Sequence, residues 1–414
     1  MSLMRDFPDV LIVGGGAAGL MAAVSAGRLG RSVWVLERNA RPARKVLITG
    51  KGRCNVTNNC DLDALMEHIP QNPRFLYSAF AAFSPADTMA FFEAAGVPLK
   101  TERGNRVFPV SDNARDIADA LVREARAAGA RLLQGTAAEL LTENGRVSGV
   151  RCEDGSEYRA ASVILCCGGC SYPLTGSDGS GWTLARQAGH SCTPIRPSLI
   201  PVLTRETDPK EMMGLSLRNV TLTVRENGKE IFSELGELLF AHFGVSGPLV
   251  LSASAHMRKM GTASYEMRID LKPGLTEDQL DKRLLRDFSQ NLNRDSINAL
   301  GALLPRKMIP VVLRRAGIPF DAKVRDLTRE QRQALLRVIK GFSLTPVGFR
   351  PVEEAIVTSG GVPVREVSPK TMESRLLPGL YFAGEMLDVD AYTGGFNLQI
   401  AFATGWLAGQ HAGG

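Results

Sequence analysis

Three glycines near the amino terminus have the spacing Gly-x-Gly-x-x-Gly, and this spacing suits phosphate chemistry. Gly14, Gly16 and Gly19 follow an apolar run at residues 10–13 that is typical of a buried strand. The first glycine permits a tight turn, the second lets the backbone approach a pyrophosphate, and the third lets helix and strand pack closely. Glu37 ends the next apolar segment, where an acid accepts hydrogen bonds from a ribose diol. The pattern predicts a dinucleotide site.

The helix that opens after this turn begins with Ala17 and Ala18. A helix N-terminus carries roughly half a positive charge and presents free N–H groups, so it attracts phosphates. The negative charge of Glu37 disfavours a ribose 2′-phosphate, and Arg38 follows it directly. We therefore expect these residues to surround the adenosine and pyrophosphate of the cofactor.

The glycine fingerprint alone does not separate FAD from NAD, but two further segments favour FAD. Residues 45–58, KVLITGKGRCNVTN, are punctuated by glycine, and their Arg53 and Asn55 can hydrogen-bond a pyrophosphate or a flavin edge. Residues 166–169, Cys-Cys-Gly-Gly, end a buried strand. Rossmann-type flavoproteins turn tightly beside the cofactor at such a position.

A second strand-to-helix glycine turn lies close to the carboxyl terminus. Residues 381–385, Tyr-Phe-Ala-Gly-Glu, precede Gly-Gly-Phe-Asn-Leu at 394–398 and a helix that runs to about Gln410. FAD enzymes use such a turn to cover the flavin end, where the helix dipole stabilises negative charge on the reduced ring. The predicted cofactor-binding residues are Gly14, Gly16, Ala17, Ala18, Gly19, Glu37, Arg38, Lys45, Gly52, Arg53, Cys54, Asn55, Ala137, Cys167, Gly168, Gly384, Glu385, Gly395, Asn397 and Leu398.

The pattern of strands and helices around these turns predicts an α/β protein. Residues 1–198 and 345–414 together are predicted to form one discontinuous Rossmann-type FAD-binding domain. Apolar and polar residues alternate at 220–224 and again at 265–271, with a turn at Asn227-Gly228. This pattern predicts an inserted antiparallel β domain, residues 199–272. Residues 273–344 are predicted to form a small, basic helical domain.

Composition is that of an ordinary globular protein, with 44% hydrophobic and 22% charged residues in 414. Residues 1–8 lack the pattern of a signal peptide. The apolar segment 10–26 is interrupted by glycines, which suits a strand and helix better than a membrane span. Seven cysteines without framework spacing favour a reducing cytoplasm.

The net charge of +6 is concentrated in one region. Residues 277–340 hold 14 Lys and Arg against 8 Asp and Glu, a balance of +6. Basic helices of this kind are most often solvated faces, and the alternative is an anionic partner, either a nucleic acid or a carboxylated substrate.

Four long stretches of the chain resemble the bacterial BaiN/RdsA-type flavoproteins. They are VGGGAAGL (13–20), KVLITGKGRCNVTN (45–58), FAHFGVSGP (240–248) and YFAGEMLDVDAYTGGFNLQIAFATG (381–405). The resemblance implies the three-part architecture above and FAD as the cofactor. It also implies flavin contacts by Glu37, Arg53, Gly384, Glu385, Gly395 and Asn397. Family members often carry Ala-Thr-Gly-Gly where this chain has Cys-Cys-Gly-Gly, so the thiols are peculiar to it.

The resemblance implies two possible activities, each the reduction of a carbon–carbon double bond conjugated to a carbonyl. One acts on 3-oxo bile-acid intermediates, and the other makes dihydrouridine in large-subunit ribosomal RNA. Both need a hydride for the β-carbon, a proton for the α-carbon and donors for the enolate oxygen. The leading hypothesis is the bile-acid reductase. The alternatives are a uridine reductase, with RNA held by the basic helices, and a flavin-holding electron carrier.

NAD(P)H is expected as a transient electron donor. The glycine-rich run 176–181 lacks the strand and the acid of a second dinucleotide frame, so the chain has no separate nicotinamide domain.

Candidates for the proton source are Cys54, His242 and Tyr392. Each has an alternative role: Cys54 as a buried small residue, His242 as a structural histidine and Tyr392 as a residue that packs on the flavin rim. Cys167 and Cys170 form a Cys-x-x-Cys that suits a redox disulfide, although the cofactor turn already explains the glycines between them. No metal site is expected, because a second ligand pair for zinc is missing.

Overall fold

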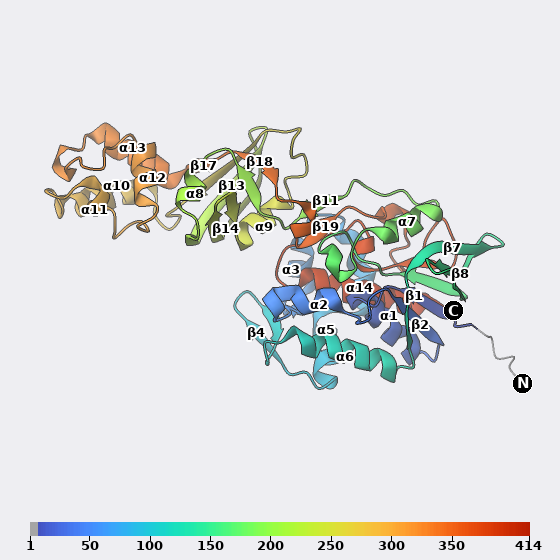
Figure 1. Ribbon diagram of the computed structural model, residues 1–414. Helices are drawn as coiled ribbons and strands as arrows, with labels where there is room; N and C mark the ends of the chain where they lie inside the picture. The colour runs from blue at the N-terminus through green and yellow to red at the C-terminus, as the bar shows by residue number, and fades with distance from the viewer. Residues whose placement is uncertain (1–6) are drawn as a thin grey trace, which may run out of the picture. The chain divides into compact units, whose positions relative to one another are not determined.

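The computed structural model describes residues 7–414 and divides into two compact units. Unit 1 comprises the chain up to Ser198 together with Val352–Gly414, and unit 2 comprises Leu199–Pro351 (Figure 1). The amino-terminal residues 1–6, within the stretch where the sequence predicts no signal peptide, lie outside the described part. The domain limits inferred from the sequence stay a prediction.

Unit 1 is built on a parallel sheet of five strands in the order β20-β10-β1-β2-β6. Its strands are β1 (Val10–Val13), β2 (Val33–Glu37), β6 (Arg131–Gln134), β10 (Ser162–Leu165) and β20 (Leu380–Phe382). All residues of β1, β10 and β20 are buried, as apolar strands covered on both faces should be. Since parallel strands end at the same edge, the turns after β1, β10 and β20 meet there.

Two helices from opposite ends of the chain, α1 (Ala17–Arg28) and α14 (Phe396–His411), pack against each other (Figure 1). Glycine makes the close approach possible. A Cβ at Gly405 would lie 2.2 Å from the carbonyl oxygen of Ala18, and one at Gly409 would lie 2.4 Å from that of Ala22. Both distances are far below contact, so the first and last segments of the chain form one core.

The remaining elements of unit 1 surround this core. An antiparallel meander has a tight turn at Asn144 (φ +50°) and Gly145 (φ +74°), between β7 (Ala137–Glu143) and β8 (Arg146–Cys152). The other strands are β3 (Thr57–Asn58), β4 (Leu99–Glu102), β5 (Arg106–Pro109), β9 (Glu157–Arg159), β11 (Arg196–Ser198) and β19 (Val357–Ser359). The helices are α2 (Arg44–Ile48), α3 (Leu62–Glu67), α4 (Tyr77–Ala82), α5 (Pro85–Ala94), α6 (Ala114–Ala127) and α7 (Ser180–Gln187).

Unit 2 contains an antiparallel sheet in the order β17-β16-β13-β14-β15-β12-β18. The strands are β12 (Val202–Thr204), β13 (Ser216–Glu226), β14 (Lys229–Ala241), β15 (Gly244–Ser246), β16 (Tyr265–Asp270), β17 (Phe342–Leu344) and β18 (Pro346–Phe349). The alternating Val220, Leu222 and Val224 are all buried, and Asn227-Gly228 makes the predicted turn with positive φ at both residues.

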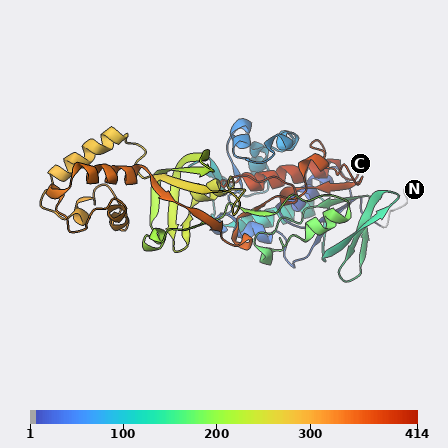
Figure 2. The same ribbon diagram turned by 90° about the horizontal axis from the view of Figure 1, so that it is seen from above.

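The other part of unit 2 is helical. The helices of the unit are α8 (Asp208–Glu211), α9 (Pro248–Ser254), α10 (Glu277–Ser289), α11 (Ser296–Ala299), α12 (Ile309–Arg315) and α13 (Arg329–Lys340). The helices α10 to α13 lie at the end of the unit away from the sheet (Figure 1 and Figure 2), while α8 and α9 pack against the sheet. Capping boxes start α10 and α13, where Thr276 and Thr328 each accept from the amide three residues on.

The predicted fold class is confirmed: a parallel Rossmann-type sheet is combined with an inserted antiparallel sheet and helices. Across residues 7–414, no helix is long and apolar enough to cross a membrane.

Candidate functional site

The first glycine turn leaves one position open and closes the others. A Cβ at Gly14 (φ +103°) would lie 2.5 Å from the carbonyl oxygen of Cys166, and one at Gly19 would lie 1.9 Å from that of Gly14. No described atom lies within 4 Å of a Cβ placed at Gly16. Gly16 is also the N-cap of α1, and no side chain caps this helix. The amides around Ala17 therefore face space that an anion can enter.

Glu37 is held beside this turn by three hydrogen bonds. It is 9% exposed, and its Oε2 accepts from the backbone amide of Gly15 at 2.7 Å. Its Oε1 accepts from the backbone amide and the side-chain amide of Asn39 at 2.8 and 2.7 Å. This fixed carboxylate at the end of β2 suits a ribose diol. Arg38, next along the chain, pairs with Asp178.

Sequence reasoning missed Asn39, although a signal was available. An asparagine two residues beyond the acid that ends β2 can fold its side chain back onto that acid. Asn39 Nδ2 also donates to the backbone oxygen of Thr175 at 3.1 Å and so ties the loop before α7 to the site.

The turn after β10 packs tightly, burying Cys166 and partly burying Cys167 and Cys170. A Cβ at Gly168 (φ +76°) would lie 2.7 Å from Ser177 Oγ. Burial, followed by the charges of Glu37 and Asp178, raises the pKa of Cys167 to about 12. Burial also raises the pKa of Cys170, and all seven cysteines are free. The redox disulfide between Cys167 and Cys170 stays a prediction, and the raised pKa values disfavour the thiolate that such a disulfide exchanges through.

The second glycine turn presents another open helix N-terminus. A Cβ at Gly395 (φ +97°), the N-cap of α14, would lie 2.4 Å from the carbonyl oxygen of Thr57. No side chain caps α14, and its first turn has no acidic residue. The side chain of Asn397 is hydrogen-bonded to Ala391. The backbone amides of Asn397 and Leu398 lie in the first turn of α14, near its N-terminus. Gly384 (φ +67°) is the closely packed glycine after β20, and a Cβ there would lie 3.0 Å from that of Ala18.

Lys45 and Glu385 form an ion pair that joins four distant segments. Lys45 Nζ lies 2.7 Å from Glu385 Oε2 and also donates to Ser171 Oγ at 2.7 Å. Glu385 Oε1 accepts from the backbone amide of Thr358 at 3.0 Å. The side chains of the pair are 23% and 18% exposed, so this charge pair is shielded from most of the solvent. Two predicted cofactor neighbours thus contact each other.

Protein groups already hold the guanidinium of Arg53, which the sequence predicts as a flavin contact. Nη2 lies 2.5 Å from Glu102 Oε1 and 2.6 Å from Asp112 Oδ1, and the group stacks over Phe108 at 4.1 Å. The hydrogen bonds that the guanidinium donates to Glu102 and Asp112 raise the pKa of Arg53. A cofactor contact by Arg53 stays a prediction and would have to compete with two carboxylates.

Asn55, close by, carries a buried side-chain oxygen without a partner. Among the described residues, nothing hydrogen-bonds to its Oδ1. A buried acceptor left unpaired costs free energy. This oxygen can therefore accept a hydrogen bond from a donor on a ligand. Gly52 (φ +84°) has nothing within 4 Å of a Cβ, and Ala137 begins β7 opposite Cys152.

The three candidate proton sources have different surroundings. Cys54 is fully buried, and burial raises its pKa to about 12. Tyr392 is 9% exposed, and its backbone amide donates to the carbonyl oxygen of His68 at 2.9 Å. His242 is exposed at the turn between β14 and β15 of unit 2, with its ring edge-on to Phe243 at 5.0 Å. Cys54 and Tyr392 belong to the unit that holds the glycine turns, and His242 does not.

The residues present fit FAD. The open position at Gly16, two helix N-termini without side-chain caps, the fixed Glu37 and the unpaired oxygen of Asn55 are the features that such a dinucleotide uses. Within residues 7–414 no group of three or more His, Cys, Asp or Glu side chains is arranged to hold a metal ion.

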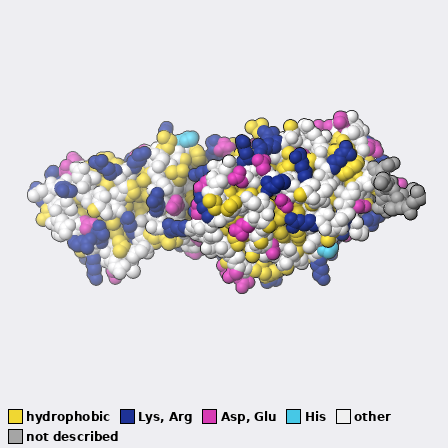
Figure 3. Space-filling view, turned by 90° about the horizontal axis from the view of Figure 1, so that it is seen from below, with side chains coloured by type: hydrophobic (Ala, Val, Ile, Leu, Met, Phe, Trp, Pro, Cys, Tyr) yellow, Lys and Arg dark blue, Asp and Glu magenta, His cyan; other side chains and the backbone are white. Residues whose placement is uncertain are grey.

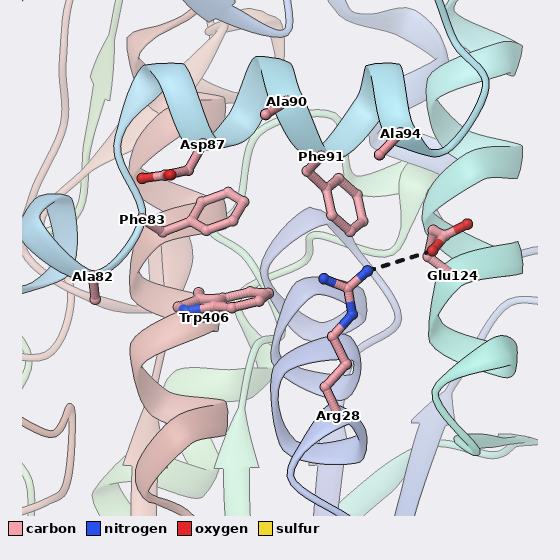
Figure 4. A pocket seen from close by; sticks show the side chains of 9 residues that line it. All are labelled: Arg28, Ala82, Phe83, Asp87, Ala90, Phe91, Ala94, Glu124 and Trp406. Atoms are coloured by element: carbon pink, nitrogen blue, oxygen red, sulfur yellow. Dashed lines mark ion pairs between the residues drawn. The ribbon is translucent and has the colours of Figure 1, made fainter.

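A groove of about 490 Å³ lies elsewhere on unit 1 (Figure 4). In it the guanidinium of Arg28 lies 5.5 Å from the ring of Phe91 and 5.9 Å from that of Trp406, and it pairs with Glu124 at 3.5 Å. Arg28 ends α1 and Trp406 lies in the second half of α14, so the groove is away from the N-termini of both helices. Its lining is completed by Ala82, Phe83, Asp87, Ala90 and Ala94.

The fold and the site define a Rossmann-type FAD-dependent oxidoreductase. The family described as HI0933-like protein Rossmann domain matches residues 8–411, and the chain belongs to this family. The resemblance to the BaiN/RdsA-type flavoproteins is thereby confirmed.

Two curated relatives span nearly the whole chain. The 3-dehydro-bile acid delta(4,6)-reductase of Clostridium scindens is 34% identical over 406 residues, which are 97% of this chain and 98% of that protein. The ribosomal RNA dihydrouridine synthase of Escherichia coli is 30% identical over 404 residues, 97% of each chain. Among solved structures, 3-ketosteroid delta1-dehydrogenase from Sterolibacterium denitrificans has a TM-score of 0.54 at 13% identity, covering 99% of this chain and 100% of that one. At this identity the likeness concerns the fold alone.

Proposed function

We propose that the protein reduces a carbon–carbon double bond conjugated to a carbonyl in a small, steroid-like acid, with 3-oxo-4,6-diene bile acids as the substrate class. The observation that carries the proposal is the open dinucleotide cradle around Gly16 and Glu37. The substrate class rests on the bile-acid reductase that is 34% identical across 97% of the chain.

Particular residues would hold FAD in this cradle. Glu37 would accept from the adenosine ribose, and the amides of Gly16 and Ala17 would face the pyrophosphate. The amides at the start of α14, with Asn55 Oδ1, would face the flavin end. When bound, the flavin supplies hydride chemistry to an activated double bond.

The chain itself must supply the proton for the α-carbon and shield the reacting atoms from water. Cys54 and Tyr392 are both buried in unit 1, and each carries a proton that it can give to a basic carbon. The thiol of Cys54 is neutral at physiological pH, because burial raises its pKa to about 12. His242, in unit 2, is the third candidate donor. NAD(P)H is proposed as the transient donor that reduces the flavin.

The charges of unit 2 favour a small substrate over RNA. Arg314 pairs with Asp208 at 2.6 Å and with Glu211 at 2.8 Å, and Arg315 pairs with Asp208 at 2.5 Å. On α10, Arg283 and Arg286 both contact Asp287, at 2.6 and 3.4 Å. On the face of unit 2 that Figure 3 shows, Lys and Arg side chains are scattered and do not form one continuous patch. Cations already balanced by carboxylates release few counterions on meeting a phosphate backbone.

The test is anaerobic reoxidation of the reduced, FAD-loaded protein. We expect a 3-oxo-4,6-diene bile acid to reoxidise the flavin rapidly, while the saturated 3-oxo bile acid, the matched control, leaves it reduced. Equal rates with both compounds, or no reaction with either, would contradict the proposal. A flavin that no alkene reoxidises would favour an electron carrier.

A second candidate is reduction of uridine in ribosomal RNA. It is favoured by the Escherichia coli relative, 30% identical over 97% of the chain, and by the exposed Lys282 and Arg306. For these two side chains the described residues of unit 2 provide no carboxylate partner. Reoxidation by a uridine-containing ribosomal RNA fragment alone, with steeply salt-dependent binding, would put this candidate first.

A further inference from the structure

Two short strands carry the chain out of unit 1 and back into it. Unit 2 begins at Leu199 and ends at Pro351, so β11 (Arg196–Ser198) immediately precedes it and β19 (Val357–Ser359) soon follows it. The strands pair antiparallel within unit 1, with Arg196 opposite Ser359 and Ser198 opposite Val357. Both covalent connections to the inserted unit therefore pass through one two-stranded ladder.

A single buried carboxylate binds both strands of this ladder. Asp390 is 1% exposed, and its Oδ2 accepts from Ser198 Oγ at 2.7 Å. Its Oδ1 accepts from Ser359 Oγ at 3.0 Å. A buried charge is costly unless it is hydrogen-bonded, so these hydroxyls offset the burial of the carboxylate. Each strand contributes one of them.

The residues that follow Asp390 are fixed just as firmly on the cofactor side. The backbone amide of Ala391 donates to Asn397 Oδ1 at 2.9 Å, and Asn397 Nδ2 donates to the carbonyl oxygen of Ala391 at 2.7 Å. The amide of Tyr392 donates to the carbonyl oxygen of His68 at 2.9 Å. Asn397 lies in the first turn of α14, the helix whose N-terminus fits the flavin end. Asp390 thus stands between the ladder and the candidate donor Tyr392.

We propose that Asp390 is a positioning residue that fixes Tyr392 and the start of α14 to the β11–β19 ladder. It acts through its neighbours along the chain and through Asn397. We call the bonds of Asp390 to Ser198 and Ser359 the clamp. The proposal rests on the proposed function only in giving Tyr392 a part in the reaction, because the clamp exists in the protein without substrate.

The clamp has a mechanical consequence. Because each oxygen of one carboxylate holds a different strand, a change in the angle between β11 and β19 must break one hydroxyl bond or move Asp390. Moving Asp390 moves Tyr392, two residues away. The position of a candidate proton donor is therefore sensitive to the two connections of unit 2.

Hydrogen exchange of the full FAD-loaded chain, read by mass spectrometry, tests the clamp. We expect Ser198→Ala and Ser359→Ala each to raise exchange of the amides in residues 390–397 about tenfold, the effect of one hydrogen bond to a charged group. Ser25→Ala is the matched control, because it also deletes a buried hydroxyl, which donates to the backbone oxygen of Trp406 at 2.8 Å. Wild-type exchange at 390–397 in both ladder variants, or an equal rise in Ser25→Ala, would overturn the proposal.

Substitution of Asp390 separates the clamp from its charge. In Asp390→Asn the amide oxygen can still accept from one serine, and the amide N–H can donate to the hydroxyl oxygen of the other. Exchange at 390–397 should therefore stay within about threefold of wild type. Asp390→Ala removes both serine contacts and should raise the exchange about a hundredfold. Equal rises in the two variants would assign the effect to charge and overturn the clamp.

Steady-state kinetics with the enone substrate gives the second readout. We expect Ser198→Ala and Ser359→Ala to lower kcat about tenfold with KM unchanged, because the substitutions displace a donor and not the binding surface. Unchanged kcat alongside raised exchange would overturn the positioning role. If no enone is turned over, the proposed function fails, and the exchange experiment still decides whether the clamp exists.

Discussion

At the scale of single residues, burial decides what the thiols near the glycine turns can do. Burial raises the pKa of Cys54 to about 12, and it raises that of Cys166 well above the usual range. A thiolate is the form that attacks disulfides and binds metals, so these side chains are poorly suited to either task. A neutral thiol keeps its proton until a strongly basic centre takes it, and an enolate carbon is such a centre.

The raised pKa values predict slow alkylation. At pH 8 a thiol of pKa about 12 is thiolate in about one molecule in ten thousand, so Cys54 and Cys167 should resist iodoacetamide in the folded protein. Peptide mapping after timed labelling measures this, with Cys60, which is less buried than Cys54, as the internal comparison and urea-unfolded protein as the control. Labelling of Cys54 as fast as Cys60 would contradict the assignment.

Glu37 gives a second prediction at this scale. Glu37→Ala removes the carboxylate that would accept from the ribose and leaves the amide of Gly15 without its 2.7 Å partner. We expect the Kd for FAD to rise about a hundredfold, and that for Glu37→Gln, which keeps one acceptor, about tenfold. Fluorescence titration of the apoprotein measures both. An unchanged Kd in Glu37→Ala would place the adenosine elsewhere.

At the scale of elements, glycine fills two different roles along α1 and α14. Gly405 and Gly409 allow backbone contact between the helices, and the space around them is full. Gly16 borders open space, because the element that would fill it is the cofactor and not the protein. Glycines of similar appearance in the sequence therefore serve packing in one case and binding in the other.

This contrast predicts opposite outcomes for two alanine substitutions. Gly16→Ala should leave the free energy of unfolding of the apoprotein within about 0.5 kcal/mol and abolish FAD binding, since its Cβ would occupy the phosphate site. Gly405→Ala should cost about 1–3 kcal/mol or more by forcing α1 and α14 apart. Chemical unfolding and FAD titration of both variants measure this. Normal FAD affinity in Gly16→Ala would show that the pyrophosphate does not use this turn.

At the scale of the whole molecule, the sequence predicts what depends on local pattern. The Gly14-x-Gly16 turn, the hairpin at Asn227 and the half-buried strands could be predicted, because φ values and alternating burial follow from neighbouring residues. The contacts of Asp390 and the pair of Lys45 with Glu385 could not, since they join segments separated by up to 340 residues. Such contacts depend on how the sheet edge assembles, and no local pattern marks them.

Each unit also contains a histidine whose pKa is lowered: His190 is buried in unit 1, and His256 is partly buried in unit 2. Burial lowers the pKa of His190 in unit 1, and burial with the charge of Arg258 lowers that of His256 in unit 2. His190 Nδ1 lies 3.0 Å from Glu366 Oε2, and Nε2 lies 2.7 Å from Ser374 Oγ. Because a carboxylate only accepts, Nδ1 carries the proton and Nε2 accepts from the serine.

These lowered pKa values make both units sensitive to acid. Below a pH of about 6.5 the unfolded chain binds a proton at each histidine that the folded unit does not bind, so stability falls as pH falls. The slope is at most about 1.4 kcal/mol per pH unit for one proton.

All three tryptophans, at positions 34, 182 and 406, lie in unit 1, so their fluorescence follows the unfolding of that unit alone. We expect urea unfolding by this signal to lose stability between pH 7 and pH 5, with a smaller loss in His190→Gln and the wild-type loss in His256→Gln. A loss that is equal in all three proteins would mean that His190 does not carry the acid sensitivity of unit 1.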